Sequence, residues 1–435
     1  MDVWSLAIYA LAMVLITAYY LRRQSRTHAR HLKILQDTVA AGMTEPASLH
    51  PLIDASKCLG CGTCVSACPE TSHHDVLGLI NGKAALIGPT DCIGHGACKT
   101  ACPFDAITLV FGTERRGLDI PLLKPNFESN VPGIYVAGEL GGMGLIKNAL
   151  TQGQQALEAI AKAGVKRPGA LDVLIIGAGP AGFAASLTAK KMGLSYQTLE
   201  QEALGGAVFQ YPRGKLVMTA PVELPIIGKV QFRNTTKEEL LKFWTQACNG
   251  NDLHISYQER VESMEQKDGA FHVKTNKGQH VAATVLLGIG RRGTPRKLGV
   301  PGEEMSKVVY RLIDPEQYRG QQVIVVGGGD SALEAAASIA ELGDTKVVLS
   351  YRGDAFQRAK QRNRQRVDEA TSKGQLNIML NSQIKEIRED EVLLKQSGKE
   401  LKMRNDAVIV SAGGILPNDF LKSIGIHVET KFGTA

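Results

Sequence analysis

Aromatic residues are scarce in this chain: Phe, Trp and Tyr make up 5% of its 435 residues. Proteins that bind single-stranded nucleic acid stack bases on aromatic side chains, and this composition supplies few such platforms. The formal charge of +7 is also small, and much of the excess lies in residues 22–33 and 352–366 rather than along one recognition helix. The sequence therefore argues against a nucleic acid as partner.

Cysteine is absent after Cys248, and seven of the eight cysteines fall between Cys58 and Cys102. Such crowding suits metal ligation better than a disulfide framework, and it indicates a reducing compartment. Glycine is plentiful at 46 residues and clusters after apolar strands, as phosphate-binding turns require. With 44% hydrophobic and 21% charged residues, the composition is that of a globular protein of about three domains.

Charge is missing altogether from the nineteen residues 3–21. At 1.5 Å per residue a helix of this length spans about 28 Å, close to a hydrocarbon core of about 30 Å. A cleaved signal peptide would need a basic start, yet Asp2 is the only charge before the run; a buried core helix is the other alternative. We therefore expect residues 1–21 to be a retained, single-pass membrane anchor.

Basic residues follow this run at once, so the positive-inside rule places the bulk of the protein in the cytoplasm, at the cell inner membrane. Residues 22–51 are expected to form a solvated juxtamembrane stalk, in which Leu32, Leu35 and Val39 have helical spacing. The basic residues after the run are Arg22, Arg23, Arg26, Arg30 and Lys33.

Two cysteine runs lie in residues 52–110, a segment too small to fold on hydrophobic burial alone. Each has the spacing C-x2-C-x2-C-x3-C before a proline, with His95 as the second member of the second run. The runs resemble those of two-cluster bacterial ferredoxins, in which the fourth cysteine of each serves the other cluster. Zinc sites would leave the proline-terminated pairing unexplained. The resemblance implies one cluster on Cys58, Cys61, Cys64 and Cys102, and a second on Cys68, Cys92 and Cys98.

His95 is the departure from the ferredoxin pattern, since it replaces a cysteine in register. Three outcomes are open for the second cluster: a 4Fe-4S cluster with His95 as ligand, a 3Fe-4S cluster, or a four-iron cluster whose fourth ligand does not come from the protein. A neutral imidazole in place of a thiolate would make the cluster less negative and raise its reduction potential.

The pattern changes after residue 111 to alternating apolar strands, glycine turns and alanine-rich helices, which predicts an α/β fold with parallel sheets. Residues 171–182 form an apolar strand that runs into Gly177, Gly179 and Gly182, and Glu200 ends the next strand. The glycines allow a diphosphate to approach the backbone at the start of a helix, and Glu200 would accept a hydrogen bond from a ribose hydroxyl.

A second motif of this kind occupies residues 321–343 and supplies Gly327, Gly329 and Ala332. Two such folds in one chain suggest one site for a flavin and one for a nicotinamide. With the connecting stretch TVLLGIGRRGTPRKLGVPGEE, the motifs resemble those of thioredoxin-reductase-like flavoproteins over about residues 168–425. The resemblance implies FAD at the first motif and NAD(P)H at the second.

Thioredoxin reductases proper carry a C-x-x-C just before the second nucleotide motif, and this chain has no cysteine there. It is most similar to the members that lack the dithiol, such as the bacillithiol-disulfide-reductase-like and ferredoxin-NADP-reductase-like proteins. Dithiol exchange at that position is therefore not available.

The closing segment of that family does not follow the second motif here, yet a matching stretch occurs at residues 126–162. This predicts a circularly permuted FAD domain. By resemblance, Gly138 and Glu139 would contact the ribityl-phosphate part of FAD, and a helix starting near Leu145 would point its N-terminus at the pyrimidine ring. The permutation would also tether the ferredoxin module to this strand and hold a cluster beside the flavin.

The strand after the second motif bears on the choice of nicotinamide. An NAD site usually has an acid at its end, whereas Ser350, Tyr351 and Arg352 stand here, with Arg358 soon after. NADPH is therefore favoured. Asp354 and the lack of a second arginine leave NADH as the alternative.

The sequence thus predicts electron transfer from NAD(P)H through FAD and two iron-sulfur clusters to an acceptor, or the reverse. The alternatives are an NADPH-dependent disulfide reductase acting at the flavin and a non-catalytic redox sensor or docking module. The sequence identifies neither a catalytic side chain nor the acceptor, which is a redox protein or a small molecule; a homodimer is a candidate assembly.

The predicted architecture has two Rossmann-like domains, a small α+β ferredoxin domain and one transmembrane helix. The expected boundaries are 1–21 for the anchor, 22–51 for the stalk, 52–110 for the ferredoxin domain, 111–167 for the permuted part of the FAD domain, 168–318 for the FAD domain, 319–412 for the NAD(P) domain and 413–435 for the return to the FAD domain.

Overall fold

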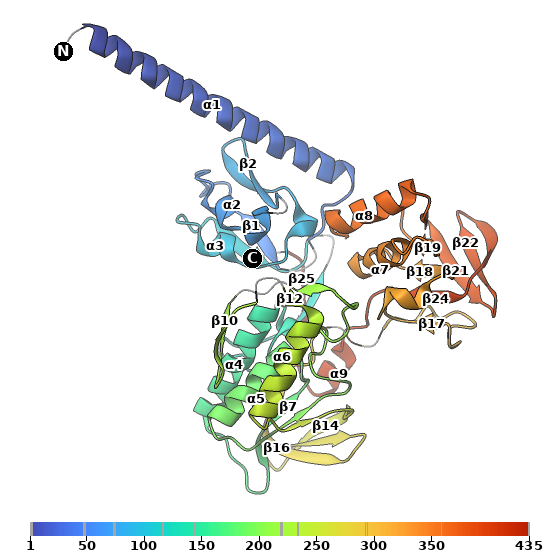
Figure 1. Cartoon of the computed structure of the whole chain (residues 1–435). Coiled ribbons are helices and arrows are strands. Elements are labelled where there is room, and N and C mark those ends of the chain that lie inside the picture. The colour runs from blue at the N-terminus through green and yellow to red at the C-terminus, as the bar shows by residue number, and fades with distance from the viewer. Residues whose placement is uncertain are drawn as a thin grey trace. The chain divides into compact units, whose positions relative to one another are not determined.

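The computed structural model of the protein divides into two compact units, and Figure 1 labels many of their elements. The first comprises Met1–Val110, Ala355–Lys360 and Gly433–Ala435, and the second comprises Phe111–Asp354 and Gln361–Phe432. The residues that the structure describes are 3–46, 49–72, 75–114, 117–142, 144–217, 221–232, 235–291, 293, 295–357 and 359–433.

The cysteine-rich part of the first unit is built from two short antiparallel strand pairs and two short helices. It begins at residue 50, two residues before the expected boundary. Cysteines make up much of its buried cluster, so the apolar core is as small as the sequence predicts. The elements are β1 (His50–Ile53) paired with β4 (Ile107–Val110), β2 (Leu77–Ile80) paired with β3 (Lys83–Leu86), α2 (Thr63–Ala67), α3 (Ala97–Thr100), η1 (Pro69–Ser72) and η2 (Pro89–Asp91).

A single helix, α1 (Val3–Ala40), precedes this module and packs on it with its C-terminal part. His31 and Thr38, two turns apart, are buried, and the Leu79 backbone N–H donates to His31 Nδ1 at 2.9 Å. An added Cβ at Gly78 would lie 2.8 Å from His31 Cγ, so the helix and β2 are in close contact. The prediction of a solvated stalk is therefore wrong for this part of the chain: the contact is made by polar side chains, which the apolar spacing did not indicate.

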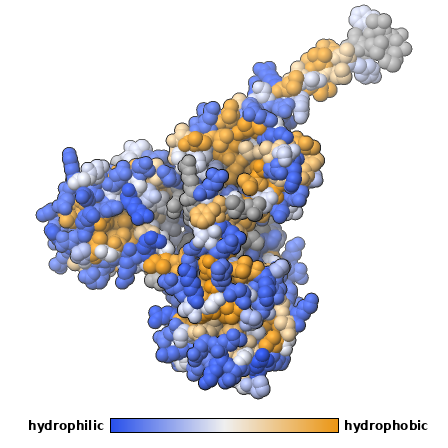
Figure 2. Space-filling model, turned by 180° about the vertical axis from the view of Figure 1, so that it is seen from behind, coloured by the Kyte–Doolittle hydropathy of each residue, from blue (hydrophilic) through white to orange (hydrophobic). Residues whose placement is uncertain are grey.

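The outer part of α1 carries apolar side chains on all sides, and Figure 2 shows this apolar surface on the helix. Among the residues that the structure describes, no helix is long and apolar enough to cross a membrane. The side chains of residues 3 and 5–8 lie outside that description. The structure thus does not support the span predicted for residues 1–21.

The domain of the second unit that is expected to bind FAD contains a seven-stranded, mostly parallel sheet. Its parallel strands are rich in Val, Ile and Leu and are buried on both faces, as strands covered by helices must be. The strand order is β13 (Ile255–Ser256), β8 (Tyr196–Leu199), β7 (Leu171–Ile176), β16 (Gln279–Leu287), β15 (Ala270–Thr275) and β14 (Val261–Lys267), with β6 (Ile134–Val136) also paired to β16. The helices are α4 (Ile146–Ala163), α5 (Pro180–Lys191) and α6 (Lys237–Gly250).

The segment 126–162 lies inside this domain. β6 pairs in parallel with β16, with Ile134 opposite Val285, and α4 packs along α5. β25 (Val428–Lys431) pairs with β5 (Leu118–Pro121), and Leu421 and Ile426 join the same core as β6. Residues 126–162 and the C-terminal residues thus pack with the strands of the first glycine motif. Circular permutation as the origin of this arrangement stays a prediction.

The NAD(P) domain has its own five-stranded parallel sheet and a three-stranded antiparallel sheet. The parallel order is β17 (Val308–Val309), β24 (Ala407–Val410), β18 (Gln322–Val326), β19 (Lys346–Ser350) and β20 (Leu376–Met379), with α7 (Asp330–Ala340) and α8 (Gln361–Ser372). The antiparallel sheet is β21 (Ser382–Ile387), β22 (Glu391–Gln396) and β23 (Lys399–Arg404). The smaller elements of the unit are η3 (Glu139–Gly141), β9 (Leu216–Val217), β10 (Val222–Leu224), β11 (Gly228–Val230), β12 (Thr235–Thr236), η4 (Pro315–Tyr318) and α9 (Asn418–Ser423).

Gly153 provides a test of where the 126–162 segment lies. A Cβ at this position of α4 would overlap the Ala181 carbonyl oxygen of α5, so Gly153→Val should lower the free energy of unfolding by about 3 kcal/mol. Gly250→Val, at the end of α6 with no atom within 4 Å of the added Cβ, is the control. Thermal unfolding measures both; equal melting temperatures would contradict the packing of α4 on α5.

Candidate functional site

The two cysteine motifs meet around a cavity in the ferredoxin module. Cys68 of the first motif lines it together with Cys92, His95 and Cys98 of the second, and its empty volume is about 310 Å³, including space open to solvent. This is the crossing between motifs that the ferredoxin resemblance implies for the second cluster. A cavity lined by thiols fits an iron-sulfur cluster. Within the described residues, no three His, Cys, Asp or Glu side chains are placed to share a single metal ion.

The other predicted set, Cys58, Cys61, Cys64 and Cys102, differs in exposure. Cys58 and Cys64 are buried, whereas Cys61 is exposed. Backbone N–H groups point at two of the sulfurs: Ala84 lies 3.4 Å from Cys58 Sγ, and Ala106 lies 3.4 Å from Cys102 Sγ. Such N–H···S bonds help set a cluster's reduction potential. Cys58 of the first motif and Cys102 of the second motif thus each have a backbone N–H directed at the sulfur.

Two of the buried cysteine thiols, Cys64 and Cys92, have raised pKa values. Burial raises the pKa of Cys64 to about 11, and it raises the pKa of Cys92 to about 11 as well. Negative charge on neighbouring cysteines raises both pKa values further. Because cluster ligands are thiolates, bound iron would have to supply the positive charge that stabilises them, which couples cluster binding to the fold of this module.

The backbone repeats itself at the two motifs. Gly62 and Gly96 precede α2 and α3 with φ of 79° and 78°, a left-handed conformation that glycine adopts without strain. The chain therefore turns in the same way at both motifs, and the cysteine two residues after each glycine, Cys64 or Cys98, is buried.

His95 lines the same cavity as Cys68, Cys92 and Cys98, at the sequence position where the ferredoxin pattern has a cysteine. Its Nε2 is 3.7 Å from Glu70 Oε1. Burial lowers the pKa of His95, while the carboxylate of Glu70 acts in the opposite direction. The net lowering favours the neutral imidazole, the form that can bind metal.

The first glycine motif brings strand β7, helix α5 and Glu200 together. A Cβ at Gly182 would overlap the Gly177 carbonyl oxygen, and a Cβ at Gly177 would lie 2.7 Å from the Gly288 oxygen. Glu200 is buried, and its carboxylate accepts from the N–H groups of Ala178 at 2.7 Å and Glu202 at 2.9 Å. Burial raises the pKa of Glu200. Gly179 lies at the helix start, and a Cβ added there would have its nearest neighbour, Gly206 Cα, at 3.9 Å. A diphosphate at a helix start needs such room beside the backbone.

Gly138 and Glu139 follow β6 at the same edge of the sheet. The Gly138 N–H donates to Gln152 Oε1 of α4 at 2.9 Å, which ties this turn to the helix expected to face the flavin. Glu139 lies beside a residue that the sequence analysis did not single out, Arg291. Burial lowers the pKa of Arg291, and the carboxylates of Glu139 and Asp119 oppose that shift. Its place in the stretch GIGRRG, after a strand that ends beside the first motif, is the only sequence signal.

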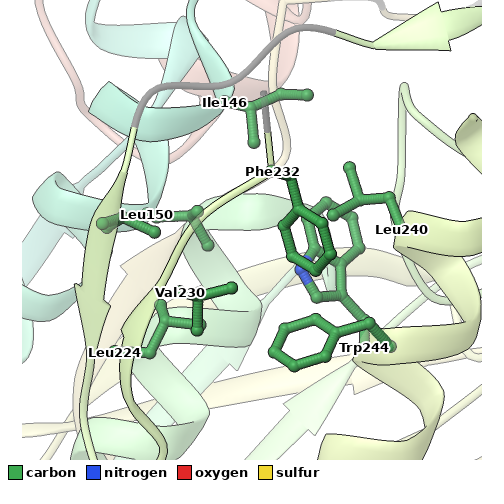
Figure 3. A pocket seen from close by; sticks show the side chains of 9 residues that line it. Ile146, Leu150, Leu224, Val230, Phe232, Leu240 and Trp244 are labelled. Atoms are coloured by element: carbon green, nitrogen blue, oxygen red, sulfur yellow. The ribbon is translucent and has the colours of Figure 1, made fainter. Parts of the chain in front are cut away.

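An apolar cavity next to the first turn of α4 is shown in Figure 3. Its empty volume is about 250 Å³, and its lining comes from α4, β10, β11 and α6, including Ile146, Leu150 and the buried Trp244. It holds no charged side chain, so it fixes the position of the helix rather than binding an ion.

The second glycine motif has the form that the sequence predicts. Gly327 and Gly329 flank the turn from β18 to α7, and Ala332 is fully buried. A Cβ at Gly328 would overlap the Tyr351 ring, so this tyrosine lies over the turn.

The basic residues of this domain differ in exposure and in their partners. Arg352 is exposed after β19, and Arg358 lies outside the described residues. Arg366 is half-buried, and its guanidinium donates to both carboxylate oxygens of Glu341, at 2.9 and 2.8 Å.

The fold and these two sites define a two-domain dinucleotide-binding flavoprotein with an added cysteine-rich module. The chain belongs to the pyridine nucleotide-disulphide oxidoreductase family, whose model matches residues 174–433. Residues 50–103 match the model of a 4Fe-4S dicluster domain. The protein is an FAD-dependent NAD(P)H oxidoreductase that carries a 4Fe-4S domain.

Relatives support this assignment. A ferredoxin–NADP reductase of Ignicoccus hospitalis is 30% identical over 60% of this chain and 83% of its own. The bacilliredoxin reductase Bdr of Bacillus subtilis is 24% identical over 60% of this chain and 82% of its own. The solved bacillithiol disulfide reductase Bdr from Bacillus cereus has the same fold, with a TM-score of 0.53, 24% identity and coverage of 59% of this chain and 81% of that one.

His95 yields a prediction about the second cluster. His95→Cys should keep a four-iron cluster and lower its reduction potential, because a thiolate adds negative charge, whereas His95→Ala should give a three-iron or unstable site. Electron paramagnetic resonance and redox titration of the purified variants measure both effects. Spectra and potentials unchanged in both variants would remove His95 from the coordination sphere.

Proposed function

We propose that the protein passes electrons from NADPH through FAD to two iron-sulfur clusters and from them to an acceptor. The observation that carries this proposal is the fusion of the modules. The cysteine-rich module ends at β4, and β5 of the FAD domain begins after seven residues, 111–117. A linker this short keeps the local concentration of one module near the other high. The likeness to ferredoxin–NADP reductases agrees with a chain that contains a ferredoxin-like module of its own.

Bound FAD supplies the conversion between two-electron and one-electron chemistry. The residues of the chain divide the remaining tasks. The turns at Gly177 and Gly327 hold the two dinucleotides, and Arg352 favours NADPH over NADH. The apolar, close-packed surroundings of α5 exclude water from the backbone that contacts the diphosphate.

The proposal places one cluster on Cys58, Cys61, Cys64 and Cys102, and a second on Cys68, Cys92 and Cys98 with His95. The cavity lined by Cys68, Cys92, His95 and Cys98 supports the second set. Cys61 of the first set is exposed, whereas Cys68, Cys92, His95 and Cys98 of the second set are buried or half-buried. Electrons therefore leave the protein from the first cluster, since transfer to an external acceptor needs an approach to the surface.

A second candidate is disulfide reduction directly at the flavin, which the likeness to bacilliredoxin reductase favours. Outside the cluster motifs the chain has one further cysteine, Cys248. It is buried, and burial raises the pKa of its thiol to about 11, so it cannot act as an exchanging thiolate. A disulfide substrate would have to meet the flavin itself.

An anaerobic titration of the full chain with NADPH tests the proposal. Bleaching of the flavin should be followed by the electron paramagnetic signals of reduced clusters, and NADPH should give a higher kcat/KM than NADH. Gly329→Asp is the control, because a carboxylate there repels the incoming diphosphate: its clusters should be reduced by dithionite and not by NADPH. A flavin reduced by NADPH beside clusters that stay oxidised would favour the disulfide reductase.

The protein is also proposed to attach to a membrane through the outer part of α1, with the remainder in the cytoplasm. What supports this is a run of exposed apolar side chains in successive positions, which covers every face of the helix: Leu11, Met13, Val14, Leu15 and Ile16 are each at least 60% exposed. Apolar surface of this kind is seldom left in water. The arginines that follow favour the cytoplasmic side for the rest of the chain.

Fractionation of cells that express the full chain tests the attachment. The native protein should sediment with membranes and resist a high-salt wash, and Leu15→Asp/Ile16→Asp should release it, because a charge in the bilayer core costs about 2.5 to 3.5 kcal/mol. Val39→Asp, an equally exposed position near the other end of the same helix, should stay bound. Native protein found wholly in the supernatant would contradict the proposal.

A further inference from the structure

Arg291 has a buried hydrogen-bond donor without a partner. It follows the end of β16 by four residues, and its Nη1 is shielded from solvent yet makes no hydrogen bond to any residue that the structure describes. Burying a guanidinium N–H without an acceptor costs free energy, and native proteins rarely do so unless a ligand or a water accepts the hydrogen bond.

The acids nearest to Arg291 do not complete it. Asp119 already accepts from Asn418 Nδ2 and from Thr430 Oγ1, each at 2.7 Å. Glu139 lies along the turn into α4, where a Cβ at Gly144 would be 3.4 Å from its Oε1. Both carboxylates act on Arg291 electrostatically, which holds the guanidinium at this edge of the sheet without occupying Nη1.

Arg291 lies at the edge of the sheet where FAD is expected to bind. β16 lies between β7, which leads to the first glycine motif, and β6, which leads to Gly138 and Glu139. Ligands of open α/β sheets bind at the carboxyl ends of the strands. FAD carries a negatively charged diphosphate, and Glu139 alone would repel it; Arg291 balances that acid and leaves one donor free.

We propose that Arg291 binds FAD directly, with Nη1 donating to a negatively charged oxygen of the cofactor. Glu139 then serves as a positioning residue, which holds the guanidinium in place. Two groups of the cofactor offer such an oxygen, the diphosphate and the pyrimidine ring of the reduced flavin. Their shared chemistry is an anionic oxygen that accepts a charge-assisted hydrogen bond.

The test measures FAD affinity and flavin potential in the full chain. Release of FAD on serial dilution of the holoenzyme, followed by flavin fluorescence, gives Kd. Arg291→Gln should raise Kd about tenfold or more, since charge-assisted hydrogen bonds to a buried group are among the stronger ones. Arg296→Gln, an exposed arginine in the loop that follows, should leave Kd within about twofold. A lowered flavin potential in Arg291→Gln would place the contact at the ring, and an unchanged potential would place it at the diphosphate.

Two results would overturn the proposal. One is a Kd for Arg291→Gln equal to that of the native protein. The other is recovery of native affinity in Glu139→Gln/Arg291→Gln, which would show that Arg291 acts only by neutralising the acid. If Arg291→Gln does not fold, as judged by circular dichroism, Arg291→Met decides: it keeps an apolar chain of similar length and removes every donor, so native affinity in that variant would reject a direct contact.

Discussion

The arrangement of the FAD domain depends on two places where backbone touches backbone. Gly182 lets the start of α5 approach the Gly177 carbonyl, and Gly153 lets α4 approach the Ala181 carbonyl of the same helix turn. Together they fix the phosphate-binding turn and the helix from the 126–162 segment against one another. Neither contact tolerates a side chain, because the opposing atoms belong to the backbone and cannot rotate away. The position of Glu139 and the N-terminus of α4 follow from these contacts.

The sequence predicted those features whose chemistry admits few residue types. Glycines at a phosphate-binding turn, and cysteines at fixed spacing, leave little choice, so both nucleotide sites and the meeting of Cys68 with Cys92 and Cys98 could be anticipated. β6 could be placed because its apolar run matched a family pattern. His31 and Thr38 could not, since polar residues on a helix give no sign of burial. Arg291 was missed because one more arginine in a basic loop looks solvated until the strands around it are assembled.

The two cysteine sets differ in exposure and in hydrogen bonding. Burial raises the thiol pKa in both, at Cys64 of the first set and at Cys92 and Cys98 of the second. At the first set, N–H donors from Ala84 and Ala106 approach the sulfurs, and Cys61 is open to solvent. Under the proposed function, clusters bound in these two surroundings would have different reduction potentials.

The helix α1 is unbroken from its apolar outer part to the turn that packs on β2. In a continuous helix each residue adds a fixed rise and a fixed rotation. The ten residues from Leu21 to His31 therefore advance about 15 Å along the axis and turn through about 1,000°. The number of residues between the apolar run and His31 therefore fixes two quantities. One is the distance along the helix axis between the apolar run and the cysteine module, and the other is the direction about that axis in which the exposed Cys61 faces. Insertion of a single residue in that stretch would swing the module by about 100° while lifting it only about 1.5 Å. A change in the length of this helix therefore alters the orientation of the cysteine module much more than its distance from the apolar run.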